Sequence, residues 1–352
     1  MNGRRPPFVL DLPDGYVVRE AERADAAGIA SVYADAYPAG TEYPLVSERR
    51  VRRDLVDDAS VRPFVVETDG ELVAAAAIEY DSLDEGNAQI CKLAVKRAHR
   101  GKGFGRVLLK HRLNVLATDG SFSGLVYVAA VTAHPASQHN LVARGFAPFS
   151  FHKNFQGGYF GPGNESEIIM LYTDSIEYAE RSVYVPERYR HVVERTLAQV
   201  SLDLLGRRLV LTEDVAFPTL DVDCLRTGIE HNREFLWEVT ASGTDAWVET
   251  EAELTAAIRR DDTHLMVPID ANTPALASLY DALEADGFYP AGFIPDWLTR
   301  DGEKRDAFVF QHPPHDEPTR IDVVADVKAL IEVLGVDYRV LESHDRYWTL
   351  EL

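Results

Sequence analysis

The sequence predicts an α+β protein with about two domains. Its 352 residues, 46% of them hydrophobic, supply enough apolar side chains for sizeable cores. Short apolar runs bounded by turn residues alternate with segments in which apolar residues recur at helical spacing. A weak internal repeat supports two domains, because Leu125–Phe146 and His264–Phe288 share one pattern: a strand, a turn with proline, a helix and Gly-Phe.

The first half of the chain contains a hairpin and several helices. The residues Thr68-Asp69-Gly70-Glu71 predict a tight turn between two strands, and Ser47 is a residue type that caps helix N-termini. The predicted elements are a strand at Tyr16–Glu20, helices over Arg23–Tyr37 and from Ser47 to about Asp57, strands at Arg62–Glu67, Leu72–Tyr80 and Gln89–Val95, a helix from Phe104 to Leu116, and strands at Leu125–Thr132, Phe146–Asn154 and Glu167–Thr173.

The second half has the same mixture of elements. Pro186 precedes a helical pattern, in agreement with the preference for proline at the first turn of a helix. The predicted strands are Ser182–Val185, Arg208–Thr212, Phe235–Thr240, His264–Ile269, Ala307–Gln311, Tyr338–Leu341 and Trp348–Leu352, the last two as a pair, and the predicted helices are Glu187–Val200, Glu249–Arg260, Thr273–Asp286 and Asp322–Leu334.

The composition excludes several classes of partner. The net charge of −21 argues against nucleic acid and anionic membranes, because both bind basic surfaces. No run approaches the roughly 20 apolar residues of a membrane helix, and no apolar signal core follows Arg4-Arg5, so we expect a cytoplasmic protein. The two cysteines, Cys91 and Cys224, provide neither a disulfide framework nor a metal-ligand cluster, and we expect no metal.

The most informative segment runs from Gln89 to Leu116, where a glycine-rich turn joins a strand to a helix. The turn reads Arg100-Gly101-Lys102-Gly103-Phe104-Gly105. It presents successive backbone N–H groups, and the start of the helix adds unpaired donors and the positive end of its dipole. The segment therefore predicts a pyrophosphate site. A dinucleotide-binding fold is disfavoured, because the turn follows several strands and no acidic ribose partner comes after it.

The segment resembles motif A of the GNAT superfamily of N-acetyltransferases, through Leu93-Ala94-Val95 and the turn Arg100–Gly105. The resemblance implies a three-layer, GNAT-like fold in which helices flank a mixed, mostly antiparallel central sheet. It implies that the turn holds the pyrophosphate of acetyl-CoA or another acyl-CoA. The pantetheine arm would lie along the splayed end of the Gln89–Val95 strand, and a backbone N–H near Val95 would polarise the thioester.

The CoA site implied by the resemblance combines the strand, the turn and the start of a later helix. Its residues are Leu93, Ala94, Val95, Arg100, Gly101, Lys102, Gly103, Phe104, Gly105, Arg106, His134 and Ser137. The same region is the most basic stretch of an acidic chain, which suits the phosphates of CoA. This basic cluster consists of Lys92, Lys96, Arg97, Arg100, Lys102 and Arg106.

The chain departs from the family pattern at the positions that carry catalysis. Gln89 stands where many GNAT members have a glutamate base, and it cannot usefully accept a proton. Leu141 stands where motif B has a tyrosine that protonates the leaving thiolate, although Gly145-Phe146 fits the end of that motif. His134 takes the place of the usual asparagine. The proton-transfer groups must therefore lie elsewhere, or the domain binds acyl-CoA without catalysis.

Three explanations remain open. A carboxylate near the strand ends acts as the base, directly or through water, with Glu79, Asp81 and Glu85 as candidates. Alternatively a histidine, His134 or His139, transfers protons, since histidine titrates near neutrality. The third is binding without turnover. We select Glu79, Glu85 and His134 as the candidate catalytic residues. Tyr127 is a weaker candidate acid, and Cys91 is disfavoured as a nucleophile because no His–Asp pattern surrounds it.

The predicted function is transfer of an acetyl group from acetyl-CoA to a primary amine by direct attack in a ternary complex, without a metal. The acceptor is a small molecule or a peptide, and Tyr37, Tyr43 and Gln89 are its predicted contacts. In the GNAT pattern the connection after the first helix borders the acceptor site, so Glu42 is a further candidate contact. The alternatives are a longer acyl-CoA donor and a regulatory or scaffolding module that binds acyl-CoA without turnover. We expect neither nucleic acid nor membrane as a partner, and a homodimer is an open alternative.

The resemblance extends weakly into the second half. The stretch Ser278–Phe288 resembles motif B, with Tyr280 near the usual tyrosine, but Leu220–Glu249 contains nothing like the glycine-rich turn. We therefore predict tandem GNAT-like domains, a catalytic one at 1–174 and a degenerate one at 175–316 that completes the acceptor site or stabilises the protein. Residues 317–352 form a C-terminal extension.

Overall fold

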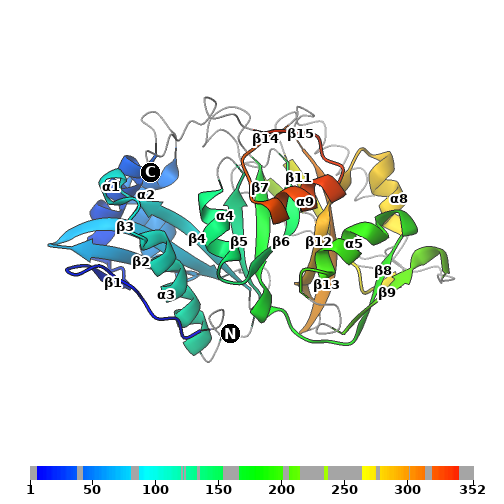
Figure 1. The fold of residues 1–352 in the computed structure, drawn as a ribbon, viewed down its shortest axis with the longest axis horizontal. Coiled ribbons are helices and arrows are strands. Elements are labelled where there is room, and N and C mark those ends of the chain that lie inside the picture. The colour runs from blue at the N-terminus through cyan, green and yellow to red at the C-terminus, as the bar shows by residue number, and fades with distance from the viewer. Residues whose placement is uncertain are drawn as a thin grey trace. The chain divides into compact units, whose positions relative to one another are not determined.

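We analysed a computed structural model of the chain (Figure 1). It describes residues 6–37, 43–80, 87–119, 122, 124–132, 135–153, 166–200, 206–214, 234–236, 264–274, 278–300, 302–313 and 319–340. The chain divides into two compact units. The first contains the described residues up to Ala129 together with Ala136–Phe146, and the second contains Ala130–Thr132, Pro135 and the described residues from Ala147 onward. The predicted domain boundaries at residues 174 and 316 remain predictions.

The first unit is built on a mixed, mostly antiparallel sheet, as predicted. The strand order is β1-β2-β3-β4-β5, in which only β4 and β5 are parallel. The strands are β1 (Val17–Glu20), β2 (Val61–Thr68), β3 (Glu71–Tyr80), β4 (Ala88–Val95) and β5 (Val126–Val131), and the helices are α1 (Ala26–Ala36), α2 (Glu48–Val51), α3 (Phe104–Thr118) and α4 (Ala136–Val142). The predicted order of strands and helices is thereby confirmed from β1 to β5.

Helices cover both faces of this sheet. Because β-strand side chains alternate between the faces, neighbouring residues of one strand contact different helices. The residues of α1 and α2 form one buried core with Val65 of β2 and with Ala75 and Ala77 of β3. Phe64, the neighbour of Val65, points to the opposite face, where its ring lies 5.1 Å from that of His111 in α3. The first unit therefore has the three layers of a GNAT-like fold (Figure 1).

In the second unit the strand order is β7-β6-β12-β13-β11-β10. These strands are β6 (Phe146–His152), β7 (Glu167–Tyr172), β10 (Glu234–Leu236), β11 (His264–Asp270), β12 (Tyr289–Arg300) and β13 (Glu303–His312). Two short parallel pairs accompany them, β8 (Arg181–Val185) with β9 (Arg207–Leu211) and β14 (Thr319–Ile321) with β15 (Tyr338–Val340), and the helices are α5 (Arg190–Leu197), α8 (Ser278–Ala285) and α9 (Ala325–Val333).

The structure adds elements that the sequence pattern did not predict. Strand β12 is the longer half of a hairpin with β13, and β14 is the partner of β15, for which the sequence suggested Trp348–Leu352. That segment and the predicted helix Glu249–Arg260 lie outside the described residues. The predicted helix Glu187–Val200 is shorter, because a 3-10 turn at Glu187–Tyr189 precedes α5. Whether the second unit is a degenerate GNAT-like domain stays a prediction.

A buried network of charged side chains holds β8 and β9 against β12 and β13. The fully buried guanidinium of Arg207 contacts Asp306 at 2.9 Å and Asp296 at 2.7 Å. Arg181 lies 2.6 Å from Asp296. The Asn272 side-chain amide donates to the Asp306 carboxylate at 3.1 Å, and its oxygen accepts from the Asp306 backbone N–H at 2.7 Å. Two arginines therefore balance two aspartates in the interior, which is the condition under which buried charges are tolerated.

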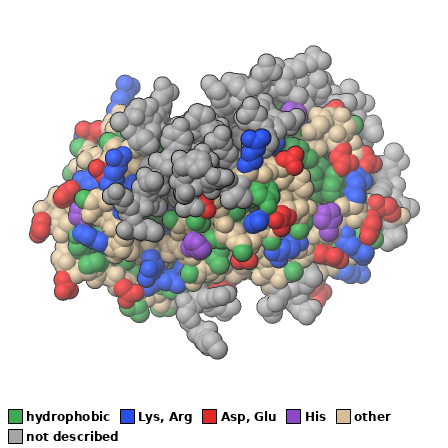
Figure 2. Space-filling view, turned by 45° about the horizontal axis from the view of Figure 1, so that its top comes forward, with side chains coloured by type: hydrophobic (Ala, Val, Ile, Leu, Met, Phe, Trp, Pro, Cys, Tyr) green, Lys and Arg blue, Asp and Glu red, His purple; other side chains and the backbone are tan. Residues whose placement is uncertain are grey.

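Charged side chains of both signs are mixed on the face of the molecule that Figure 2 shows. Figure 2 shows Lys and Arg side chains interspersed with Asp and Glu on the face in view, so the acidic excess is not gathered in one area of that face. Within the described residues, every helix falls short of the length and apolar character that spanning a membrane requires.

Candidate functional site

The glycine-rich turn forms as the sequence predicts. Gly101 has φ = +77° and Gly103 has φ = +85°, a left-handed conformation that favours glycine, and Gly103 is the N-cap of α3. In the part of the chain that the structure describes, no backbone or side-chain acceptor binds the N–H groups of residues 101–105. Five successive donors at the start of a 15-residue helix are suited to an anion such as a pyrophosphate.

The basic residues around the turn divide into two groups. Arg100, a predicted CoA ligand, donates to the carbonyl oxygens of Ala36 at 3.0 Å and Val95 at 3.4 Å, so it ties the turn to α1 and β4. Lys96 is ion-paired with Glu71, and Lys92 with Glu79. Lys102 and Arg106 are exposed beside the turn, and Lys102 donates to the hydroxyl of Tyr16 at 2.9 Å. These two are the cations best placed to meet a ligand's phosphates.

Strands β4 and β5 separate shortly after they meet. Within the described residues their ladder consists of two pairs, Ala88 with Val126 and Gln89 with Tyr127. Beyond Gln89 the β5 side of strand β4 is therefore open to an extended ligand, which can add to a sheet edge as another strand would. The predicted CoA residues Leu93, Ala94 and Val95 lie on this stretch, and Leu93 is exposed. The splayed strand end that the resemblance implied is present in the structure.

A β-bulge interrupts β4 at the same place. Ala77 pairs with Cys91 and Ala75 with Ala94, so Lys92 and Leu93 together oppose Ala76. Lys92 has φ = +55°, which is uncommon for a residue with a side chain. The bulge turns the Lys92 side chain out of the regular alternation, and its ammonium group binds the carboxylate of Glu79 on β3.

Two side chains hold this bulge from opposite faces of the sheet. From α3, the buried guanidinium of Arg112 donates to the carbonyl oxygens of Ala77 at 3.0 Å and Cys91 at 2.9 Å. From α1, the hydroxyl of Tyr33 donates to the carbonyl oxygen of Lys92. Burial lowers the pKa of Arg112 to about 10, and the guanidinium stays charged at neutral pH. These contacts give hydrogen-bond donors to carbonyl groups at and beside the bulge.

The predicted catalytic and acceptor residues meet only in part. Glu79 pairs directly with Gln89 across the β3–β4 ladder, and its side chain is 38% exposed. The rings of Tyr37 and Tyr43 stack with centroids 4.0 Å apart, and the ring of Tyr33 lies 5.5 Å from that of Tyr43. Burial raises the pKa of Tyr37 to about 12, so its hydroxyl is neutral at physiological pH. The remaining candidates Glu42, Asp81, Glu85 and His134 lie outside the described residues.

Two further residues bear on the predicted site. Ser137, in the first turn of α4, has a buried Oγ that makes no hydrogen bond within the described part of the chain. An unsatisfied buried hydroxyl fits a residue that meets a ligand.

The Cys91 sulfur lies 3.6 Å from a carboxylate oxygen of Glu79 and 3.6 Å from the ammonium nitrogen of Lys92, and burial raises the pKa of its thiol to about 11. The thiol is therefore protonated at neutral pH, which argues against a covalent acyl-cysteine.

Sequence reasoning did not single out Tyr33 or Arg112, and it placed Lys92 only in the basic cluster expected near the CoA phosphates. Tyr33 lies on the apolar face of its predicted helix, and Lys92 belongs to the predicted basic cluster. Arg112 directly precedes Leu113 in the apolar stripe of α3 and is itself buried. A charged residue in such a stripe signals a buried polar contact, because an arginine is rarely buried unless it is paired.

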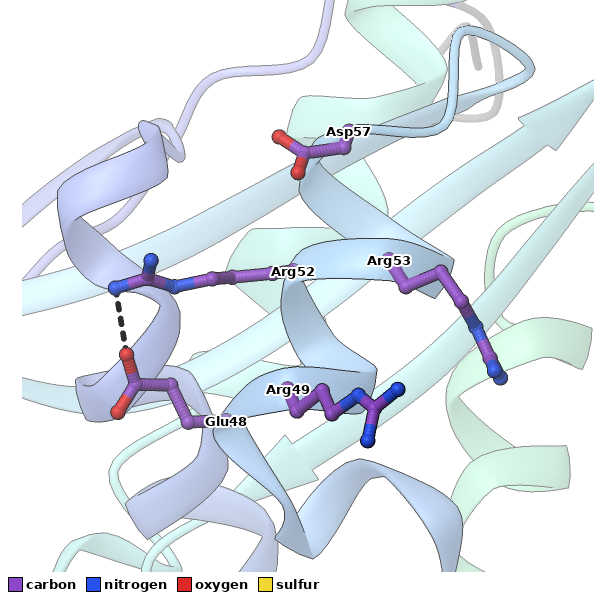
Figure 3. Close-up of a pocket in the computed structure, with 5 residues that line it drawn as sticks. All are labelled: Glu48, Arg49, Arg52, Arg53 and Asp57. Carbon is purple, nitrogen blue, oxygen red and sulfur yellow. Dashed lines mark hydrogen bonds and ion pairs between the residues drawn. The ribbon is translucent and has the colours of Figure 1, made fainter.

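A surface depression of about 630 Å³ lies on α2 and the helical turn that follows it (Figure 3). Its walls are Glu48, Arg49, Arg52, Arg53 and Asp57. The Arg52 guanidinium reaches back to Glu48 at 2.6 Å, an ion pair within one helix, and all five side chains are exposed. None of them is among the predicted site residues, so the depression is a separate feature of this helix.

Comparison with known proteins identifies the first part of the chain. A family model described as the Acetyltransferase (GNAT) family matches residues 27–146. This part of the chain is a GNAT domain. The match runs from α1 to the first residue of β6 and includes the turn, the bulge and the divergence of β4 from β5. The GNAT family uses acetyl-CoA, which agrees with the free donors of the turn.

Two curated relatives are acetyltransferases. The chain is 33% identical over 102 residues to beta-lysine N(6)-acetyltransferase of Methanosarcina mazei, a match that covers 28% of this chain and 35% of the relative. It is 33% identical over 92 residues to streptothricin acetyltransferase of Streptomyces lavendulae, covering 26% of this chain and 47% of the relative. The chain thus spans less than half the length of either relative.

Solved structures that match part of the chain include two acetyltransferases. The ribosomal-protein-S18-alanine N-acetyltransferase of Escherichia coli is 18% identical, with a TM-score of 0.36, over 44% of this chain and 92% of that one. The spermidine N-acetyltransferase of Vibrio cholerae in complex with CoA and spermine is 19% identical, with a TM-score of 0.36, over 46% of this chain and 99% of that one.

Proposed function

We propose that the protein is an N-acetyltransferase that moves the acetyl group of acetyl-CoA to a primary amine. The observation that carries this proposal is the turn of the GNAT domain, in which five backbone N–H groups have no acceptor in the described part of the chain. Both curated relatives are named as acetyltransferases, which supports the same chemistry.

The residues around the turn fit the parts of a CoA molecule. The N–H groups of residues 101–105 would hold the pyrophosphate, with Lys102 and Arg106 as nearby cations. The open side of β4 after Gln89 would accept the pantetheine arm, and the Ser137 hydroxyl is an additional polar contact. Acetyl-CoA, when bound, supplies the activated acyl group. Arg100 would act indirectly, because its guanidinium holds the turn in place.

The acceptor would lie on the α1 side of the sheet. Glu79 is the described carboxylate nearest the bulge, and it would accept the proton of the acceptor ammonium, directly or through water. Tyr37, Tyr43 and Gln89 would line the acceptor site. Because the Cys91 thiol is protonated at neutral pH, we favour direct attack of the amine over a covalent intermediate. Glu85 and His134 remain predicted catalytic residues outside the described part.

The relatives suggest an acceptor class. The relative from Methanosarcina is named for acetylation at N6 of beta-lysine, an amino group on a small molecule. We therefore place a small-molecule amine first and a peptide amine second.

Thiol release from acetyl-CoA across a panel of amines, amino acids and short peptides tests the proposal, with CoA binding followed by calorimetry. We expect binding and turnover with one acceptor class, and Glu79→Gln should lower kcat without weakening CoA binding. Binding without turnover on any acceptor would favour a longer acyl donor or a regulatory module. Absence of CoA binding would refute the assignment of the turn.

A further inference from the structure

The candidate acceptor site contains an ion pair whose cation is not part of the phosphate-binding turn. Lys92 lies in the β4 bulge, and its ammonium group binds the carboxylate of Glu79 and lies 3.6 Å from the Cys91 sulfur. The Lys92 side chain is 22% exposed and that of Glu79 is 38% exposed. Both charges are therefore partly desolvated and still accessible to a ligand.

The charge on Lys92 is permanent at physiological pH. Burial alone would lower the pKa of its ammonium, but the contact with the Glu79 carboxylate raises the pKa above its ordinary value. Lys92 therefore cannot act as a proton acceptor at neutral pH. It contributes a fixed positive charge beside the carboxylate that the proposed function uses as the base.

The neighbouring described groups leave this pair as the main source of charge. The Tyr33 and Tyr37 hydroxyls are neutral, because burial raises the pKa of each phenol. The guanidinium of Arg112 is fully buried on the α3 side and donates to the carbonyl oxygens of Leu108, Ala77 and Cys91. Within the described part of the site, Lys92 and Glu79 are an accessible cation and an accessible anion in direct contact, and the exposed Arg97 donates to the backbone carbonyl oxygen of Tyr37.

This arrangement discriminates between kinds of amine. An acceptor ammonium that takes the place of Lys92 on Glu79 leaves the Lys92 ammonium without its anion in a partly buried position, which is unfavourable. An acceptor with a carboxylate of its own restores the lost ion pair. A diamine without a carboxylate instead brings a second positive charge towards Lys92, and like charges repel.

We propose that Lys92 and Glu79 together select a zwitterionic acceptor, in which Lys92 binds the carboxylate of a free amino acid and Glu79 receives its reacting ammonium. The proposal rests on the proposed function, because it concerns the acceptor of the same acetyl transfer. It narrows that acceptor to amino acids and excludes simple diamines and polyamines as preferred acceptors.

Matched pairs of acceptors test the proposal in the full-length protein. Cadaverine is lysine without its carboxylate, and putrescine is ornithine without its carboxylate. We expect kcat/KM to favour the amino acid of a pair by roughly tenfold or more, the factor that corresponds to about 1.4 kcal/mol. Lys92→Met should reduce this ratio towards one, whereas Lys92→Arg keeps the charge and should keep the preference.

A control variant separates the effect of the Lys92 charge from a general effect of removing a lysine from an ion pair. Lys328→Met removes a lysine whose exposed ion pair with Glu332 in α9 lies outside the site, and it should leave the ratio unchanged. Equal kcat/KM for lysine and cadaverine in the unmodified protein would overturn the proposal. An unchanged ratio in Lys92→Met would also overturn it.

The test also distinguishes failure of this proposal from failure of the proposed function. If acetyl-CoA binds but no acceptor is turned over, calorimetry with lysine and cadaverine on the CoA-loaded protein measures the preference directly. Equal or absent binding then overturns the zwitterion proposal and leaves the CoA site intact. If acetyl-CoA itself does not bind, the proposed function fails and the acceptor assignment fails with it.

Discussion

Replacing Gly103 by alanine separates CoA binding from folding, because the protein contains a matched glycine elsewhere. Gly103 has φ = +85° in the turn before α3, and Gly70 has φ = +79° in the hairpin turn between β2 and β3. An added Cβ would meet no atom within 4 Å at either position. The two substitutions therefore carry the same backbone strain and no steric clash in the chain itself.

The expected magnitudes follow from this geometry. A residue with a side chain in the left-handed region costs roughly 1–2 kcal/mol, so Gly103→Ala and Gly70→Ala should lower the free energy of unfolding by similar amounts. Relief of that strain at residue 103 would also turn the neighbouring amides away from the phosphate. Loss of one hydrogen bond to a charged group costs about 1.5–3 kcal/mol, which would raise the dissociation constant of CoA by roughly 10- to 150-fold.

Calorimetry with CoA and urea unfolding of the three proteins measure both quantities. We expect Gly70→Ala to lose stability and keep its CoA affinity, and Gly103→Ala to lose both. If Gly103→Ala binds CoA as tightly as the unmodified protein, the turn is not the phosphate site. If Gly70→Ala loses affinity equally, the effect reflects general destabilisation, and the reasoning from the free amides fails.

Three further predictions concern other parts of the molecule. Asp306→Asn removes a carboxylate from the buried network around Arg207 and should lower the free energy of unfolding by about 3–5 kcal/mol. Glu303→Gln, in an exposed ion pair on the same strand, should have little effect in urea unfolding. Similar losses of stability in the two variants would contradict the role of burial. Cys91→Ala should retain most acetyl transfer, because its thiol is protonated, and inactivity would revive a covalent route. Burial lowers the pKa of His264 from 6.5 to about 3. The unfolded chain therefore takes up a proton that the folded one rejects, and the free energy of unfolding should fall by up to about 1.4 kcal/mol per pH unit from pH 6.5 towards pH 3. A urea series in which His264→Leu keeps the full acid sensitivity would refute this last assignment.

The strands and helices of the GNAT domain could be predicted because their signals are local. The hairpin between β2 and β3 follows from the turn residues around Gly70, and α3 follows from apolar residues at helical spacing after Gly105. The glycine-rich turn is likewise encoded by its own glycines. In each case the residues that define the feature are adjacent in the sequence.

Strand β12 was missed because its sequence carries residues that normally interrupt strands. Pro290, Gly292 and Pro295 fall within twelve residues, a pattern that reads as a loop. The structure accommodates them at two shifts of register against β13, one next to Pro290 and one around Pro295. Gly292 pairs with Ser150 of β6, where a Cβ would lie 2.2 Å from the Phe149 carbonyl oxygen. The glycine thus marks a close approach that only the folded chain reveals.

The acceptor side of the site could be predicted only in part. The sequence predicts Tyr37 and Tyr43 as acceptor contacts from their place near the break after the first helix. The structure shows that their rings stack, and their role as acceptor contacts stays a prediction. The bulge at Lys92 could not be identified, because nothing in a short apolar strand signals a left-handed lysine. Its support by Arg112 depends on contacts between residues far apart in the sequence, which periodicity does not encode.

The divergence of β4 from β5 has a consequence for amide hydrogen exchange. Backbone N–H groups on the open side of β4 lack the second strand that would protect them, so some amides between Cys91 and Val95 should exchange with solvent without unfolding of the domain. A ligand that adds to this edge as a strand would protect them, while the amides of β2 and β3, paired on both sides, would change little. The pattern of protected amides would thus record the path of the pantetheine arm residue by residue.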